Sequence, residues 1–346
     1  MSEATLHSVV VPVFNEVEGL EVFHQRCRAT LEGLGEPYEL IYVDDGSHDG
    51  SWGVMSTIAD REPNVRLVRL SRNFGHQVAI TAGMECATGA TVTVIDADLQ
   101  DPPEVIAELL ARWRTGADVV YAVRTRRSGE SRFKLATAAA FYRLMRWLAD
   151  VDMPVDAGDF RLLSRRAVEA LLSMPERDRY VRGMVAWIGF DTAVVHYERD
   201  PRVAGESKYP LAKMVRFALD GMMGFSMRPL RLATWLGLIV SAGAFLLAAA
   251  LVVARLLGHI PVQGWTSLAV LVLLVGGVQL VTVGALGEYV GRIYNEVRSR
   301  PLYLVRERRG FGPAGDRPGP VREGVQTVRP AGDGARTVAP SERPPA

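Results

Sequence analysis

The sequence contains little cysteine and almost no net charge. Cys27 and Cys86 are its only cysteines in 346 residues, which excludes a small secreted fold held together by disulfides. The 40 basic residues nearly balance the 39 acidic ones, so the formal net charge is +1. A general nucleic-acid-binding protein would carry a clear basic excess, and we therefore expect no nucleic-acid partner.

Several catalytic motifs are absent as well. The chain has no G-x-x-x-x-G-K-[ST] loop and no G-x-S-x-G turn. Its six histidines form no H-E-x-x-H pair and lie at no zinc-like spacing from either cysteine. Gly310, Gly312 and Gly315 match G-x-G-x-x-G, but no predicted strand precedes them and a proline lies inside the match. These observations exclude zinc enzymes, nucleophilic hydrolases and a dinucleotide site.

Two long stretches have no charge at all, although 23% of the chain is charged. Residues 232–254 and 262–287 form uncharged runs of 23 and 26 residues. A helix needs about 20 apolar residues to cross the hydrocarbon core of a bilayer. The sequence therefore predicts two transmembrane helices, over 231–257 and 262–288.

Basic residues flank the two predicted spans on the same side. The turn between the spans contains only one of them, Arg255. The positive-inside rule then predicts a multi-pass protein of the inner or plasma membrane, with the N-terminal domain and both termini in the cytoplasm. The flanking basic residues are Arg216, Arg228 and Arg231 before the first span and Arg292, Arg298, Arg300 and Arg306 after the second.

The rest of the chain divides by composition. Residues 1–210 have an ordinary globular composition and predict one folded domain. Residues 211–230 mix apolar and basic side chains, which favours an amphipathic helix in the membrane interface over an ordinary connecting helix. A juxtamembrane segment is expected over 289–305. Residues 306–346 are rich in Pro, Gly and Arg and predict a disordered tail.

Short β-rich runs alternate with helical patterns in the N-terminal domain. This alternation predicts an α/β fold with a mostly parallel sheet and helices on both faces. Ligands of such sheets bind beyond the carboxyl ends of the strands. The predicted strands are 9–14, 39–43, 65–70, 91–95 and 118–122, and the predicted helices are 17–33, 51–61, 75–87 and 103–115.

Acidic residues follow the predicted strand 91–95. Asp96 and Asp98 alternate there, and Gln100 lies two positions further on. In extended backbone, side chains two apart face the same way, so these three would present oxygens to one point. Oxygen ligands suit Mg²⁺ or Mn²⁺. Asp101, followed by two prolines, is typical of a helix cap.

Charged residues also follow two other predicted strands. Asp44 and Asp45 lie after 39–43, and their mutual repulsion predicts a donor or a cation nearby unless they form an ordinary surface turn. Basic clusters that include Arg124, Arg126, Arg127, Arg132 and Lys134, and later Arg202 and Lys208, fit phosphate recognition, with a solvated face as the alternative.

Seven motifs in order carry a specific family resemblance. They are VVVPVFNE, VDDGS, SRNFGHQ, DADLQDPPE, DAGDFRLLSR, AGESKYP and GEYVGRIYNEVRSRPLYLV. Over about residues 7–305 the chain resembles the GT-A, family 2 glycosyltransferases that transfer a sugar to a polyprenyl phosphate. Bactoprenol glucosyltransferases and dolichol-phosphate mannose synthases are the members that it resembles most.

The resemblance implies a GT-A (Rossmann-like) domain and a set of site residues. Asp96, Asp98 and Gln100 would hold Mg²⁺ or Mn²⁺, and Asp98 would count among the catalytic acids. The residues that would line the donor nucleotide and its phosphates are Pro12, Phe14, Glu16, Val43, Asp45, Ala97, Arg202 and Lys208.

The same resemblance assigns the acceptor side. Asp159 lies where the family has an important acidic residue, with Asp156 as its nearest competitor. Arg124 and Arg132 would meet the acceptor phosphate. The expected partners are a nucleotide-sugar donor, a polyprenyl phosphate and the membrane, and self-association stays open.

The function expected from the resemblance is inverting transfer of a hexose to undecaprenyl or decaprenyl phosphate at the cytoplasmic membrane face. UDP-glucose is the preferred donor, so that glucose is the sugar transferred, with GDP-mannose and a UDP-N-acetylhexosamine as alternative donors. A processive polysaccharide synthase is disfavoured because only two spans are predicted and no Q-x-x-R-W run follows the acidic motifs. A catalytically silent membrane scaffold is the alternative from another class.

Overall fold

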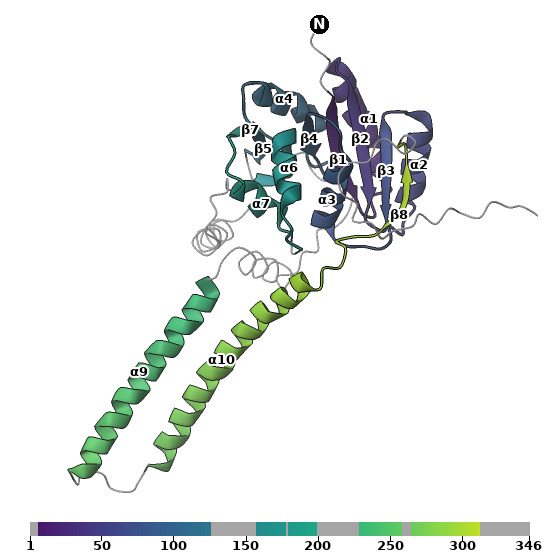
Figure 1. Ribbon diagram of the computed structural model, residues 1–346. Helices are drawn as coiled ribbons and strands as arrows, with labels where there is room; N and C mark the ends of the chain where they lie inside the picture. Colours follow the sequence, from purple (N-terminus) through teal and green to yellow (C-terminus); the bar gives the residue numbers. More distant parts are fainter. Residues whose placement is uncertain (1–5, 126–156, 178, 199–227, 258–263, 312–346) are drawn as a thin grey trace, which may run out of the picture.

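The computed structural model describes residues 6–125, 157–177, 179–198, 228–257 and 264–311. An α/β domain carries a pair of long helices that extend away from it (Figure 1). The domain is built on one sheet, whose strands have the order β7-β5-β6-β4-β1-β2-β3-β8.

The sheet is mostly parallel, as the sequence predicts. Only β6 and β8 run against their neighbours, while the remaining pairs are parallel. The strands are β1 (His7–Val13), β2 (Tyr38–Asp44), β3 (Val65–Leu70), β4 (Thr91–Val94), β5 (Val119–Arg124), β6 (Ala157–Ser164), β7 (Thr192–Tyr197) and β8 (Val305–Arg309).

Helices cover both faces of the sheet. One face packs against α1 (Leu20–Gly33), α2 (Ser51–Arg61) and α4 (Ile106–Arg114), which follows the short helix η1 (Pro103–Val105). The other packs against α3 (His76–Cys86), α6 (Arg165–Ser173) and α7 (Val181–Trp187). Both faces are therefore buried, which explains the continuous apolar run of β1.

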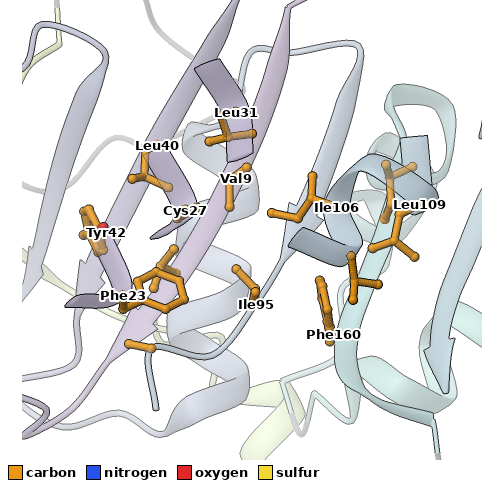
Figure 2. Packing of buried hydrophobic residues seen from close by; sticks show 14 of the residues in the cluster. Val9, Phe23, Cys27, Leu31, Leu40, Tyr42, Ile95, Ile106, Leu109 and Phe160 are labelled. Carbon is orange, nitrogen blue, oxygen red and sulfur yellow. The ribbon is translucent and has the colours of Figure 1, made fainter. Parts of the chain in front are cut away.

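The spacing of apolar residues accounts for these helices. In α1, Phe23, Cys27 and Leu31 recur every four residues and form one buried stripe. Figure 2 shows these side chains against Val9, Leu40 and Tyr42 of the sheet.

The predicted strands and helices of residues 9–122 are confirmed to within about three residues at each end. The sequence did not predict β6, β7, α6 or α7, because apolar residues are interspersed with arginines and glutamates in that region.

The prediction that residues 306–346 form a disordered tail is wrong for 306–311. β8 pairs with β3, with Arg308 opposite Val68. Val305 and Phe311 pack against the core cluster on one face of the sheet. In addition, the Arg309 guanidinium lies 5.7 Å from the Trp52 ring and the Arg308 guanidinium 5.9 Å from the Phe311 ring. Composition alone could not identify such a strand.

Two long helices follow the domain. α9 (Arg228–Leu256) and α10 (Trp265–Val297) pack side by side (Figure 1). Among the described residues, only Leu274–Val297 is long and apolar enough to cross a membrane, with a mean hydropathy of 1.3, and the apolar segment of α9 is shorter, Gly237–Leu247. The structure thus confirms two helices at the predicted positions, but by this criterion supports only one span.

Candidate active site

The carboxyl ends of the parallel strands bring polar residues to one edge of the sheet. Asp45 follows β2, Asp96 follows β4, and Arg124 ends β5. β6 runs in the opposite direction, so Asp159 near its start lies at the same edge. This is the edge at which ligands of such sheets bind.

Asp96 differs from the other two acids of this group in having an enclosed oxygen without a hydrogen bond among the described residues. Its Oδ1 is enclosed and accepts no hydrogen bond from the described residues. The nearest cationic atom is Nε2 of His76, 3.5 Å away. Burial raises the pKa of Asp96 to about 6 despite this histidine, and the acids Asp159, Asp101 and Asp98 add to the rise. A carboxylate in this setting would be stabilised by a further positive charge.

Asp98 and Gln100 lie in a turn rather than in a strand. β4 ends at Val94, and Leu99 has a φ of 59°. The carboxylate of Asp98 accepts a hydrogen bond from the backbone N–H of Gln100, at 3.1 Å. The predicted strand alternation is therefore wrong, and the turn determines how these side chains are arranged.

A metal site is only partly formed by these residues. The described part of the chain has no group of three His, Cys, Asp or Glu side chains arranged around one point. The donor chemistry nevertheless fits a hard divalent cation, because two carboxylates adjoin and Asp96 Oδ1 has no donor among the described residues. Such a cation commonly completes its coordination with phosphate oxygens and water.

Asp159 is surrounded by hydrogen-bond donors. Its side chain is 6% exposed. Arg182 donates two hydrogen bonds to it, from Nε to Oδ1 at 2.9 Å and from Nη2 to Oδ2 at 2.8 Å. Although burial favours the neutral acid, Arg182, His76 and Arg161 hold the pKa of Asp159 well below its ordinary value. The group stays ionised at neutral pH and is a poor general base. The remaining donors are Nη2 of Arg161 at 3.2 Å, Nε2 of His76 at 3.2 Å and Nε2 of Gln77 at 3.4 Å.

His76 connects the two acids. Its Nε2 lies between Asp159 and Asp96. Burial opposes its positive charge, but hydrogen bonding to Asp159 and attraction from Asp96 raise its pKa above the ordinary value. The motif SRNFGHQ contains this histidine but indicates no role for it, and no sequence pattern indicates Arg182. Only the fold brings α3, β6 and α7 together at this point.

Arg124 belongs to a second network. The Tyr197 hydroxyl accepts a hydrogen bond from Nε of Arg124 at 3.3 Å and donates one to Asp101. A guanidinium nitrogen of Arg124 also lies 3.6 Å from Asp101. The expectation that Asp101 caps the next helix is wrong, since η1 begins after Pro102 without a side-chain cap. Its carboxylate instead fixes the ends of β5 and β7.

The predicted nucleotide-binding residues are distributed around β1 and β2. Pro12 and Val43 are neighbours in register and buried, as is Ala97. Phe14 is 44% exposed. The backbone N–H of Glu16 donates to Ser51 Oγ at 3.1 Å, which fixes the turn after β1.

Asp45 binds backbone groups. Its two oxygens accept hydrogen bonds from the N–H groups of Phe74, at 2.7 Å, and Gly75, at 2.9 Å. Burial raises its pKa in spite of these bonds. The cation expected near this pair is Arg69, whose Nε lies 3.2 Å from the fully buried Asp44. The surface-turn alternative is thereby excluded.

Some predicted site residues lie outside the part of the chain that the structure describes. They are Arg132, Asp156, Arg202 and Lys208, together with the neighbouring Arg126, Arg127 and Lys134. The predicted interfacial helix lies there too, apart from residues 228–230, which begin α9.

Comparisons with known proteins show the family to which the chain belongs. A family model described as glycosyl transferase family 2 matches residues 8–172. An uncharacterized glycosyltransferase of Bacillus subtilis, YkcC, is 46% identical over 90% of this chain and 96% of its own length. The bactoprenol glucosyl transferase of Shigella phage SfX is 42% identical over 87% of this chain and 99% of its own length.

Similarity to solved structures is weaker. The mannosyltransferase PcManGT from Pyrobaculum calidifontis, in complex with GDP-Man and Mn²⁺, is 16% identical, covers 87% of this chain and 89% of its own, and has a TM-score of 0.43. Glucosyl-3-phosphoglycerate synthase from Mycobacterium tuberculosis, with Mn²⁺ and UDP-glucose, is 22% identical, covers 63% of this chain and 78% of its own, and has a TM-score of 0.43.

Proposed function

The chain belongs to glycosyl transferase family 2, and on that premise we propose that it transfers glucose from UDP-glucose to a polyprenyl phosphate. The observation that carries the proposal is similarity over nearly the whole length of enzymes named bactoprenol glucosyl transferase. Those of Shigella phages SfX and SfV are each 42% identical, and they align with 99% and 98% of their own lengths. The alignment therefore reaches beyond the catalytic domain to the helix pair.

The reaction brings two anions together. A polyprenyl phosphate attacks the anomeric carbon of the sugar while the nucleoside diphosphate leaves, and a single in-line displacement inverts that carbon. The attacking phosphate is already ionised, so no general base is needed. This fits an Asp159 that is held ionised and covered by donors. The barrier then lies in charge repulsion and in stabilising the leaving group.

Asp96 and Asp98, with the amide of Gln100, would hold a Mg²⁺ or Mn²⁺ ion. When bound, the ion acts as a Lewis acid and template that neutralises the donor diphosphate. The enclosed Oδ1 of Asp96 supports this assignment, because a buried oxygen that accepts no hydrogen bond is costly, and His76 at 3.5 Å offsets that cost only in part.

The acceptor phosphate would be bound by arginines at and after the end of β5. Arg124 ends β5 with its guanidinium oriented by Tyr197 and Asp101, and Arg132 would join it from the segment that follows. Arg202 and Lys208 would close on the donor phosphates. Pro12, Phe14, Glu16, Val43, Asp45 and Ala97 would surround the nucleotide.

We place the enzyme in the inner or plasma membrane with its catalytic domain in the cytoplasm. α9 and α10 extend from the domain side by side (Figure 1). They expose large apolar side chains along their length, among them Phe245, Leu246 and Leu280. Apolar surface of this extent needs a lipid environment. Residues 211–230 would lie in the interface and hold the site at the level of the headgroups.

Purified full-length protein, incubated with labelled nucleotide sugars and undecaprenyl phosphate, tests the proposal. We expect lipid-linked glucose from UDP-glucose in the presence of Mg²⁺ or Mn²⁺. Product from GDP-mannose or a UDP-N-acetylhexosamine alone would reassign the sugar but keep the reaction. If no donor gives a lipid product with either metal, the proposal is wrong, and UDP binding without turnover would favour the silent-scaffold alternative.

A further inference from the structure

We propose that Arg182 binds a phosphoryl oxygen of the reacting substrates, and that Asp159 is the positioning residue which holds the Arg182 guanidinium in place. The inference rests on the proposed function, since that reaction supplies two phosphate groups, the diphosphate of the donor and the monophosphate of the acceptor. It replaces the catalytic role expected for Asp159 with an indirect one.

The contact between these residues is a fork. Nε of Arg182 donates to Oδ1 of Asp159 at 2.9 Å, and Nη2 donates to Oδ2 at 2.8 Å. A guanidinium has five N–H groups in one plane, and this contact uses two. Among the described residues, Nη1 makes no hydrogen bond. The unused N–H groups form a second edge that can receive a planar pair of phosphate oxygens.

Exposure separates the two partners. The side chain of Asp159 is 6% exposed, whereas that of Arg182 is 34% exposed. The acid is therefore covered, while part of its arginine remains open to solvent and to ligands. A buried ion pair whose cation reaches the surface is the arrangement expected of a fixed anion-binding group.

Neutralisation of Asp159 does not by itself require Arg182. Arg161, which is fully buried, donates to Oδ1 of the same carboxylate at 3.2 Å. Its other bonds go to the carbonyl oxygens of Gly158 and Asp159, so Arg161 is internal to the fold. Two permanent cations thus face one carboxylate, and Arg182 is the more exposed of the two.

The backbone that carries Arg182 is also fixed. The N–H group of Val181 donates to Oε1 of Gln77 at 3.1 Å, and Nε2 of Gln77 contacts Asp159 at 3.4 Å. This ties the start of α7 to the start of α3. A guanidinium held by its backbone and by a fork loses little further freedom when it binds an anion.

The position of Arg182 places it beside the proposed metal acids. Asp159 contacts His76 at 3.2 Å, and His76 lies 3.5 Å from Asp96. Arg182 is therefore connected to Asp96, a proposed ligand of the cation on the donor diphosphate, through Asp159 and His76. A phosphate between Arg182 and a cation held by Asp96 and Asp98 would face positive charge on both sides.

The test compares full-length protein and three variants. Arg182→Gln removes the proposed anion ligand, and Asp159→Asn/Arg182→Gln removes the ion pair as a unit. Arg166→Gln is the matched control, because Arg166 makes a similar fork to Asp118 from the first turn of α6, away from the site edge. Calorimetry measures UDP binding, and initial rates measure the KM for undecaprenyl phosphate.

We expect Arg182→Gln to weaken UDP binding or to raise the KM for undecaprenyl phosphate by about tenfold or more, since hydrogen bonds to charged groups are strong. The affected constant identifies which phosphate Arg182 meets. Arg166→Gln should leave both constants unchanged. The double variant should stay as impaired as Arg182→Gln, because removing the acid does not restore a phosphate ligand.

Two results would overturn the inference. One is an Arg182→Gln protein with both constants within about twofold of wild type. The other is recovery in the double variant, which would mean that Arg182 only neutralises Asp159. If Arg182→Gln fails to fold, the double variant decides, since it removes the acid together with its forked partner and leaves Arg161 its two carbonyl partners, and near-normal constants there would contradict a binding role. Wild-type protein that neither binds UDP nor transfers sugar would instead refute the proposed function, and the inference would fall with it.

Discussion

At the scale of single residues, the acids of the site differ in their surroundings and in the direction of their pKa shifts. Asp159 is held ionised by arginines, whereas Asp96 has an enclosed Oδ1 near other acids and a pKa raised to about 6. Asp45 accepts hydrogen bonds from backbone N–H groups of the β3–α3 loop. The sequence predicted that acids gather here, but it could not assign these roles, because each depends on donors from elements far away in the chain.

Asp98→Ala tests the proposed metal site directly. We expect turnover to fall by roughly 10²-fold or more, since the variant loses an oxygen that would help to neutralise the diphosphate. The melting temperature should stay near that of wild type, because Asp98 is partly exposed and lies in a turn. Initial rates and thermal melts measure the two effects, and near-normal activity would refute the assignment.

Gly46→Ala tests the turn after β2. Gly46 has a φ of 76°, and a Cβ there would lie 2.6 Å from the backbone C of Arg72 and N of Asn73. We expect a loss of about 2 kcal/mol or more in the free energy of unfolding, since strain and overlap add.

Gly53→Ala is the matched control for this variant. Gly53 lies inside α2, and a Cβ there would meet nothing within 4 Å. Its stability should be unchanged or up to about 1 kcal/mol higher. Equal stabilities of the two variants in denaturant unfolding would contradict the account of the turn.

At the scale of elements, the site depends on strand ends that the sequence predicts only in part. The strands from β1 to β5 follow from short apolar runs of Val and Ile, which are typical of buried strands. β6 and β7 were not predicted, although they supply Asp159 and Tyr197. Arg161 in β6 and His196 in β7 interrupt the apolar pattern. Arg161 is accommodated because it pairs with Asp159 and lies 5.8 Å from the Tyr121 ring.

Tyr197→Phe tests the contact between β5 and β7. The hydroxyl orients Arg124, so its loss should raise the KM for the acceptor by roughly tenfold, in line with a hydrogen bond to a charged group. The KM for UDP-glucose should not change.

Tyr303→Phe removes a half-buried tyrosine hydroxyl that is bound to Glu85 rather than to Arg124, and should leave both constants unchanged. A uniform loss of kcat in Tyr197→Phe, with an unchanged acceptor KM, would argue against a positioning role.

At the scale of the whole molecule, the chain returns from α10 to its own catalytic domain. The backbone N–H of Ser71 donates to the carbonyl of Leu304 at 2.8 Å, and that of Arg177 donates to Glu296 at the end of α10 at 3.2 Å. β8 then covers the edge of β3 (Figure 1). The uncharged runs predicted the helix pair, but nothing in a short, arginine-rich segment predicted this return, because its pairing uses backbone hydrogen bonds.

Truncation measures the contribution of this return. A chain that ends at residue 304 lacks β8 and exposes the edge of β3, so we expect its melting temperature to fall by roughly 5 °C, corresponding to about 2 kcal/mol. A chain that ends at residue 311 keeps the strand and should melt like the full-length protein. Identical melting of the two truncated proteins in detergent would show that β8 contributes nothing to stability.

The claim on which the whole account depends is that the acids after β4 hold a divalent cation which neutralises a nucleoside diphosphate. Calorimetric titration of UDP into the full-length protein, with Mn²⁺ and again with EDTA, tests it most directly. We predict that Mn²⁺ tightens UDP binding by about tenfold or more in wild type and has no effect in Asp98→Ala. Equal UDP affinity of the wild-type protein with Mn²⁺ and with EDTA would contradict the account.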